Sequence, residues 1–195
     1  MICETSVHAG SGSDLGIIDL PIQREKHTSY PKFESSGIKG VMRQYFRNVW
    51  NEGNGKQAKL IKFFGPEPQD SDNEKATASC IGFMDGRILL FPVKSVKGVF
   101  AYITCPDVLK RFQRDMEIGD IHNFQNLDSI KELSICKNSG LLAEKDTVIL
   151  EEYAFENCRQ DEKLSDFAKN LTLSLDGVIN HYWADKIKTD IMVVS

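Results

Sequence analysis

The chain has 195 residues, of which 41% are hydrophobic and 27% are charged, and its formal net charge at pH 7 is −4. This length allows one or two domains with a buried core, and no apolar run approaches the ~20 residues that a membrane span requires. The acidic balance disfavours a protein that is basic over its whole surface. Basic residues nevertheless exceed acidic ones, eight to six, in residues 1–60. An anionic partner would therefore have to meet a local basic stripe.

The N-terminal residues and the cysteines both indicate an intracellular protein. Residues 1–5 lack the cationic region and apolar stretch of a secretory signal, so we expect a cytoplasmic location and no membrane partner. The five cysteines are scattered, odd in number and without C-x-x-C spacing, which disfavours a zinc site or a disulfide framework. We expect them to be small buried apolar residues. They are Cys3, Cys80, Cys105, Cys136 and Cys158.

Residues 36–51 have the most regular apolar pattern of the chain and predict an amphipathic helix. Ser35 or Ser36 would cap its N-terminus, and the glycines and asparagines of residues 51–55 would end it. We expect the apolar face of this helix to pack inward. The residues on that face are Ile38, Val41, Met42, Tyr45, Phe46, Val49 and Trp50.

Three cations recur at four-residue intervals on the same helix: Lys39, Arg43 and Arg47. With the N–H groups at the start of the helix, this cationic stripe could hold consecutive phosphates of a single nucleic-acid strand. The alternative is an ordinary solvated helix face.

Further along the chain, apolar runs and periodicity predict a mixture of strands and helices. After a loop rich in Pro, Asp and Ser, the order is two buried strands, a helix, a third strand and a second helix. These elements lie at residues 87–93 and 99–104, from near Pro106, at 147–150 and at 161–175. The β-prone residues 190–195 predict an edge strand or a strand cut short. This order favours an α+β fold in which a sheet packs against a helix layer.

A glycine-rich loop and a lone aspartate near the N-terminus are the candidates for chemistry. Gly10, Gly12 and Gly16 fit neither the dinucleotide fingerprint nor a Walker loop, but their backbone could form an anion-binding concavity. A simple surface turn is the alternative. Asp19 stands in an apolar stretch before Pro21, where its carboxylate could coordinate Mg²⁺ or assist proton removal in RNA cleavage. It could equally be a turn or capping residue.

A series of ordered motifs across residues 8–153 resembles the repeated backbone subunit of the type III-B CRISPR effector, the Cmr complex, which is a member of the RAMP superfamily. The motifs are His8-x-Gly10-Ser11-Gly12, the run from Asp19 to Thr28, Ser-Ser-x-x-Lys-Gly-x-x-Arg at 35–43, Phe64-Gly65-Pro66, and residues 91–102, 108–115 and 148–152. We therefore expect one domain over residues 1–195, with a divergent tail at 154–195.

The resemblance implies a modified ferredoxin-like or RRM-like RAMP domain, incomplete relative to the family. It implies a subunit that binds CRISPR RNA and, once assembled with other subunits and further copies of itself, cuts single-stranded target RNA paired to the guide. Asp19 would act in catalysis with a divalent metal, Mg²⁺. The positions implied as RNA contacts are His8, Ser11, Gln23, Arg24, Ser36, Lys39, Arg43, Lys94 and Lys97.

Two other functions stay open on the sequence. The chain could be a truncated, non-catalytic homologue, an interaction protein or decoy that caps or blocks assembly of the complex. It could also be an unrelated enzyme that binds a small phosphate compound at the glycine loop.

Overall fold

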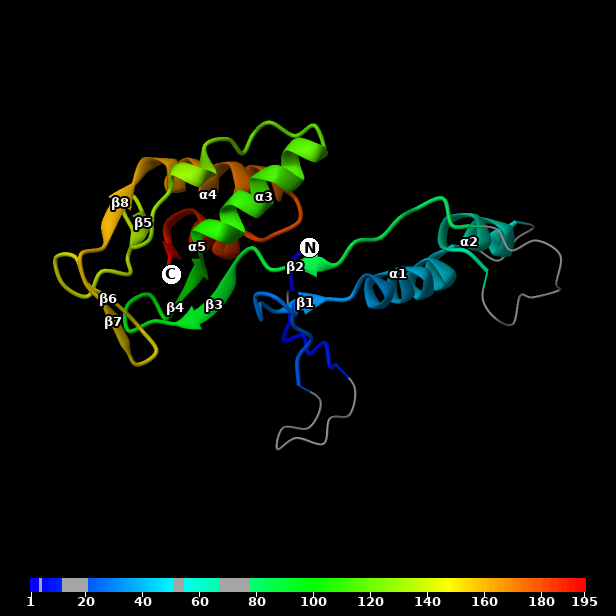
Figure 1. Ribbon diagram of the computed structural model, residues 1–195, viewed down its shortest axis with the longest axis horizontal. Coiled ribbons are helices and arrows are strands. Elements are labelled where there is room, and N and C mark those ends of the chain that lie inside the picture. Colours follow the sequence, from blue (N-terminus) through cyan, green and yellow to red (C-terminus); the bar gives the residue numbers. More distant parts are fainter. Residues whose placement is uncertain (4, 12–20, 51–54, 67–77) are drawn as a thin grey trace. The chain divides into compact units, whose positions relative to one another are not determined.

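The main sheet of the protein lies in its second half. The computed structural model describes residues 1–3, 5–11, 21–50, 55–66 and 78–195. Contacts within the chain divide it into two units, Met1–Ile88 and Leu89–Ser195, and each is described by itself (Figure 1). The expectation of one domain over residues 1–195 stays a prediction, whereas the mixed α+β class is confirmed.

The second unit is built on a mixed sheet of five strands in the order β3-β4-β9-β5-β8. The two outer pairs are β3 antiparallel to β4 and β5 parallel to β8, while β9 runs parallel to β4 and antiparallel to β5. Because β9 is central and buried on both faces, the prediction of an edge strand at the end of the chain is wrong. The strands are β3 (Phe91–Lys94), β4 (Phe100–Thr104), β5 (Ser134–Cys136), β8 (Arg159–Asp161) and β9 (Ile191–Val193).

Alternate residues of the central strand enter two different cores. Ile191 and Val193 of β9 join a core formed with the helices α3 (Pro106–Ile118), α4 (Glu162–Ser174) and α5 (His181–Thr189). Met192 points to the opposite face, where the hairpin of β6 (Val148–Leu150) and β7 (Tyr153–Phe155) closes a second core. The sheet is thus covered by helices on one side and by a hairpin on the other (Figure 1).

Several predicted elements of this unit are confirmed. The helices α3 and α4 and the strands β4 and β6 lie where the sequence predicts them, and Asp161 caps α4 by accepting hydrogen bonds from the backbone N–H groups of Lys163 and Leu164. The prediction that the first strand is buried is wrong, since three of the four β3 residues are exposed. As an edge strand β3 tolerates Pro92, which cannot donate to a neighbouring strand.

The first unit holds two helices and a short two-stranded sheet. β1 (Lys32–Phe33) pairs with β2 (Gly86–Arg87), and the helices are α1 (Ser35–Val49) and α2 (Lys56–Phe64). The expected helix at 36–51 is confirmed, but its predicted serine cap is wrong. Glu34 occupies the N-cap position without a side-chain bond, and the carboxylate of Asp85 accepts the Ser35 N–H at 2.9 Å instead.

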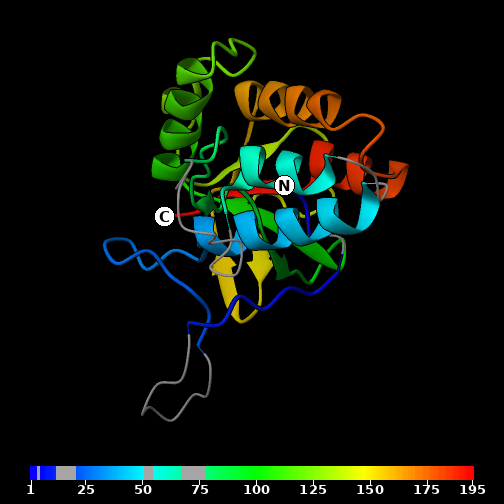
Figure 2. The ribbon, with the colours of Figure 1, turned by 90° about the vertical axis from the view of Figure 1, so that its right-hand side faces the viewer.

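α1 packs on α2 through only part of the predicted apolar face (Figure 2). The rings of Phe46 and Phe64 lie 5.9 Å apart, as do those of Trp50 and Phe63. The aromatic contacts with α2 decide which side of α1 is covered. The prediction that the whole apolar face packs inward is therefore wrong for the residues of that face that these contacts leave exposed. The exposed ones are Val41, Met42, Tyr45 and Val49.

The cysteine prediction is confirmed for three residues and wrong for two. Cys105, Cys136 and Cys158 are buried, whereas Cys3 and Cys80 are exposed. Burial raises the pKa of the Cys136 thiol to about 12. Over the described ranges, none of the helices has the length and apolar character needed to cross a membrane.

Candidate nucleic-acid interface

The two segments that flank residues 12–20 are paired with each other. Gly10 bridges Ile22 in an antiparallel arrangement, the Ser11 N–H donates to the Pro21 carbonyl at 2.9 Å, and the Gln23 N–H donates to Ala9 at 2.8 Å. Asp19, the predicted catalytic and metal-binding residue, lies outside the described residues. The expected contacts His8 and Ser11 are both exposed beside this pairing.

Gln23 and Arg24 hold the backbone of this region in place. The Gln23 amide donates to the Gly10 carbonyl at 3.0 Å and accepts the Glu34 N–H at 2.9 Å, so it ties the paired segments to the start of α1. The exposed Arg24 guanidinium donates to the Ser29 carbonyl at 2.8 Å. Contact of either side chain with RNA stays a prediction.

Asp85 is a site residue that the sequence did not reveal. Its carboxylate lies 2.9 Å from the Lys32 ammonium and accepts the Ser35 N–H. The hydrogen bond from Lys32, followed by that from Ser35, holds the pKa of Asp85 below its ordinary value of 3.8. A carboxylate thus occupies the helix start, where the sequence predicts a phosphate, while the Ser36 side chain remains exposed nearby.

The predicted cationic stripe on α1 is not a free surface in this structure. Arg43 is only 9% exposed and donates to the carbonyl of Gly65, the residue that ends α2. This contact is favourable because carbonyl groups concentrate negative charge at a helix C-terminus. Lys39 is half-buried and donates to the Ser79 hydroxyl at 3.3 Å. The expectation of a solvated stripe is therefore wrong for Arg43.

Residues 94–100, from the end of β3 to the start of β4, form a turn on which Lys94 and Lys97 are both exposed. Among the residues that the structure describes, neither ammonium group forms an ion pair or a hydrogen bond. The backbone below them is firmly held, since Lys94 and Glu151 exchange two hydrogen bonds of 2.9 and 3.0 Å. This turn therefore offers two available cations on a fixed backbone.

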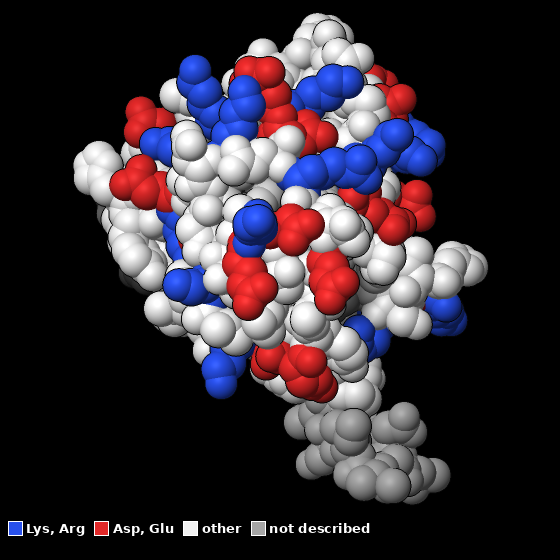
Figure 3. All heavy atoms as spheres, turned by 90° about the vertical axis from the view of Figure 1, so that its left-hand side faces the viewer, with Lys and Arg blue, Asp and Glu red and all other residues white. Residues whose placement is uncertain are grey.

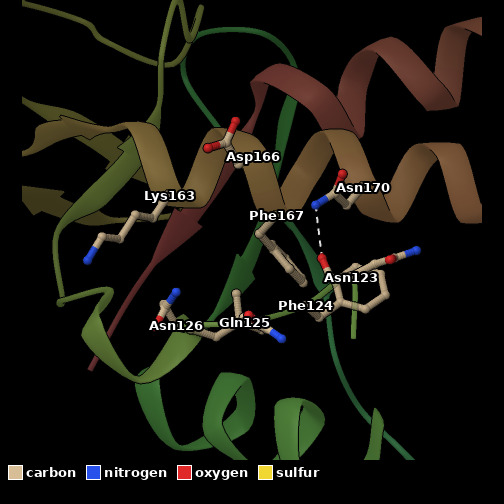
Figure 4. Close-up of a pocket in the computed structure, with 9 residues that line it drawn as sticks. Asn123, Phe124, Gln125, Asn126, Lys163, Asp166, Phe167 and Asn170 are labelled. Carbon is tan, nitrogen blue, oxygen red and sulfur yellow. Dashed lines mark hydrogen bonds between the residues drawn. The ribbon is translucent and has the colours of Figure 1, made fainter. Parts of the chain in front are cut away.

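A small pocket opens elsewhere in the second unit, between α4 and the loop before the 3-10 helix η2 (Leu127–Ser129) (Figure 4). It encloses about 140 Å³. The Asn170 amide donates to the Asn123 carbonyl at its rim, and the Lys163 ammonium is bound to the Ser129 hydroxyl. Since no expected site residue lines it, the pocket is separate from the candidate interface.

Charge on the face shown in Figure 3 is mixed, with Lys and Arg side chains interspersed among Asp and Glu. On this face the cations therefore do not form one continuous basic surface. Within the described ranges, no three His, Cys, Asp or Glu residues gather as a metal site.

The arrangement of this sheet and its helices is shared with solved structures. The chain matches the crystal structure of oligomeric Cmr4 from Pyrococcus furiosus with a TM-score of 0.70 and 34% identity, over 96% of this chain and 64% of that one. A chain in the cryo-EM structure of the type III-B Cmr-beta complex bound to cognate target RNA shares the fold, with a TM-score of 0.59 and 21% identity over 96% of this chain and 62% of that one.

Sequence comparison identifies the family. The chain is 37% identical over 194 residues to the CRISPR system Cmr endoribonuclease Cmr4 of Pyrococcus furiosus, a match that covers 97% of this chain and 61% of that relative. Residues 1–186 match the RAMP superfamily. The chain belongs to the RAMP superfamily, so the resemblance found in the sequence is confirmed. The chain spans about three fifths of the length of its Cmr4 relative.

Proposed function

We propose that this chain serves as an RNA-binding backbone subunit in a type III-B CRISPR effector. The observation that carries the proposal is the turn between β3 and β4, where Lys94 and Lys97 are exposed on a held backbone in a chain similar to Cmr4. The proposed partners are CRISPR RNA, target RNA, other subunits and further copies of the chain, in a cytoplasmic complex.

The chemistry of the turn suits a ribose-phosphate backbone. Lysine ammonium groups neutralise phosphates without reading bases, so binding should be insensitive to sequence and sensitive to salt. The remaining contacts proposed on the first unit are the exposed His8, Ser11, Arg24 and Ser36. Gln23, Lys39 and Arg43 would act there chiefly by holding the protein together, since their polar groups donate to the Gly10 carbonyl, the Ser79 hydroxyl and the Gly65 carbonyl.

For cleavage, we propose Asp19 as the residue that holds a divalent cation. Mg²⁺ is commonly bound in proteins by one or two carboxylates together with substrate phosphates, so a single aspartate fits this use. When bound, the ion would neutralise charge that develops on the phosphate. The chain itself would contribute the carboxylate of Asp19 and the pairing of Ser11 with Pro21, which fixes both ends of that segment.

Two measurements test this function. The purified chain should carry RNA, detectable by its absorbance and by nuclease sensitivity, and a chain free of nucleic acid that also fails to bind added RNA would contradict the proposal. In complexes assembled with partner subunits, Asp19→Ala should abolish target cleavage and keep RNA binding, with Asp14→Ala as the matched control. A complex that binds RNA but never cleaves it would instead identify a non-catalytic interaction protein.

A further inference from the structure

A buried ion pair lies directly beneath the turn that carries Lys94 and Lys97. Lys186 of α5 and Asp190 are 8% and 6% exposed, and the ammonium of Lys186 contacts the Asp190 carboxylate. The cation also lies 4.8 Å from the centre of the Phe100 ring. Two charges removed from water are costly unless each is well bonded, so the groups around this pair are informative.

The ammonium of Lys186 makes a second bond, which leads out of the core to the turn. It donates to the carbonyl of Gly98, 88 residues away in the sequence. The contact is close, because a Cβ atom added at Gly98 would lie 3.0 Å from the Lys186 ammonium and 3.3 Å from the Asp190 carboxylate. The pair thus packs against the backbone of the turn itself.

The residue after Gly98 has a backbone conformation that its side chain disfavours. Val99 is β-branched and 76% exposed, yet its φ is +72°. The Phe100 N–H donates to the Gly98 carbonyl at 2.9 Å and closes a three-residue turn around Val99. Turns of this kind are rare and strained, and they persist only when the surroundings hold them. The Gly98 carbonyl accepts from Phe100 and from Lys186, and the Val99 carbonyl accepts the Ser95 N–H at 3.0 Å, so the ion pair supplies that hold together with this backbone hydrogen bond.

The first half of the same turn is fastened from another side. Both the Ser95 hydroxyl and the Val96 N–H donate to the Ile149 carbonyl of β6, at 3.3 and 3.1 Å. The hairpin therefore fixes residues 94–96, and the ion pair fixes residues 98–100. Lys97 lies between these two points of attachment.

We propose that the Lys186–Asp190 pair is a positioning element, which holds the Gly98–Phe100 turn so that Lys94 and Lys97 present their ammonium groups to RNA phosphates. The inference rests on the proposed function. A fixed backbone reduces the conformational freedom lost when these two side chains bind, and this raises affinity. Lys186 and Asp190 themselves do not contact RNA.

The test is a double-mutant cycle on the full chain, with an unstructured single-stranded RNA as the probe. The first change is Lys186→Met with Asp190→Asn, which removes both buried charges together, and the second is Lys94→Ala with Lys97→Ala. The matched control is Lys188→Met with Asp185→Asn, an exposed pair on the same helix. If the ion-pair variant does not fold, Gly98→Ala takes its place, because it disturbs the contact and leaves both charges.

The ion-pair variant should weaken RNA binding by about three- to tenfold, and should cause no further loss when Lys94 and Lys97 are already alanine. Amide exchange at Ser95 and Phe100, whose N–H groups donate to the Val99 and Gly98 carbonyls of the turn, should accelerate at least tenfold, while that of β5 and β9 stays unchanged. A merely structural role would instead accelerate exchange throughout the second unit, with no preference for the turn, and would give additive losses.

The outcomes separate the inference from the function on which it rests. Additive losses, or unchanged exchange at Ser95 and Phe100, would overturn the positioning role and leave the RNA surface standing. If Lys94→Ala with Lys97→Ala alone leaves binding unchanged, the turn is not an RNA surface and both proposals fail. Rescue of binding and exchange by Lys186→Arg would support the positioning role.

Discussion

Replacing Lys94 and Lys97 with alanine should change how RNA binding depends on salt, not only its strength. Each lysine that neutralises a phosphate of a single strand contributes about 0.7 to the slope of log affinity against log salt. Because both ammonium groups are exposed and have no ion-pair partner among the described residues, each is available for one phosphate. The double variant should therefore have a slope that is shallower by about 1.4.

This difference is large enough to measure by fluorescence anisotropy. Between about 50 and about 200 mM salt, the advantage of the native chain over the variant should shrink by about sevenfold. Lys110→Ala with Lys188→Ala is a matched control of the same charge, since these exposed lysines face Asp107 and Asp185, and it should keep the native slope. An unchanged slope in the Lys94 and Lys97 variant would refute the reasoning, whatever its affinity.

Three further predictions concern the scaffold around the candidate interface. Arg43→Met should lower the free energy of unfolding, measured by urea titration, by about 1.5–3 kcal/mol, because it removes a charged hydrogen bond to a carbonyl. A loss of RNA binding at unchanged stability would instead show that Arg43 faces RNA. Because the pKa of Asp85 is lowered, its carboxylate stabilises the fold at pH values above the ordinary pKa of 3.8 and loses this effect as the pH falls through the pKa of the folded state. The native chain should therefore be more stable than Asp85→Asn at pH 7, and this difference in stability should vanish in acid. A difference in stability that does not depend on pH would contradict this prediction. With a pKa of about 12, Cys136 should resist iodoacetamide at pH 8 until the chain unfolds, while Cys3 and Cys80 react in the native protein, as mass spectrometry of the labelled peptides would show.

The sequence predicts the elements whose formation depends on local pattern. Pro106 favours the first turn of α3, and the apolar spacing of Leu164, Phe167 and Leu171 specifies α4. β5 has three residues, too few for a pattern to be recognised, and it was not predicted. The central place of β9 could not be predicted either, because it depends on pairing with β4 and β5, which lie far away in the chain.

In the candidate interface, too, residues indicated by a local motif are predicted, whereas contacts between distant residues are not. The family motif at residues 91–102 identifies Lys94 and Lys97, and the structure leaves both exposed. The groups that fix the surroundings are distant in sequence, as with Asp85 at the start of α1 and Lys186 beneath Gly98. No local pattern indicates such contacts. For Arg43, the four-residue spacing correctly places the residue on one side of a helix. The spacing does not reveal that α2 covers that side.

The position of β9 has a consequence for synthesis on the ribosome. Among the strands of the described ranges, β4 and β5 do not pair with each other, and β9 lies between them and joins them. A nascent chain that has emerged only as far as α4 therefore holds two separate half-sheets, whose facing edges lack their hydrogen-bonding neighbour. Closure of the second unit must wait until residues 191–193 leave the exit tunnel, which makes it a late event governed by distant contacts.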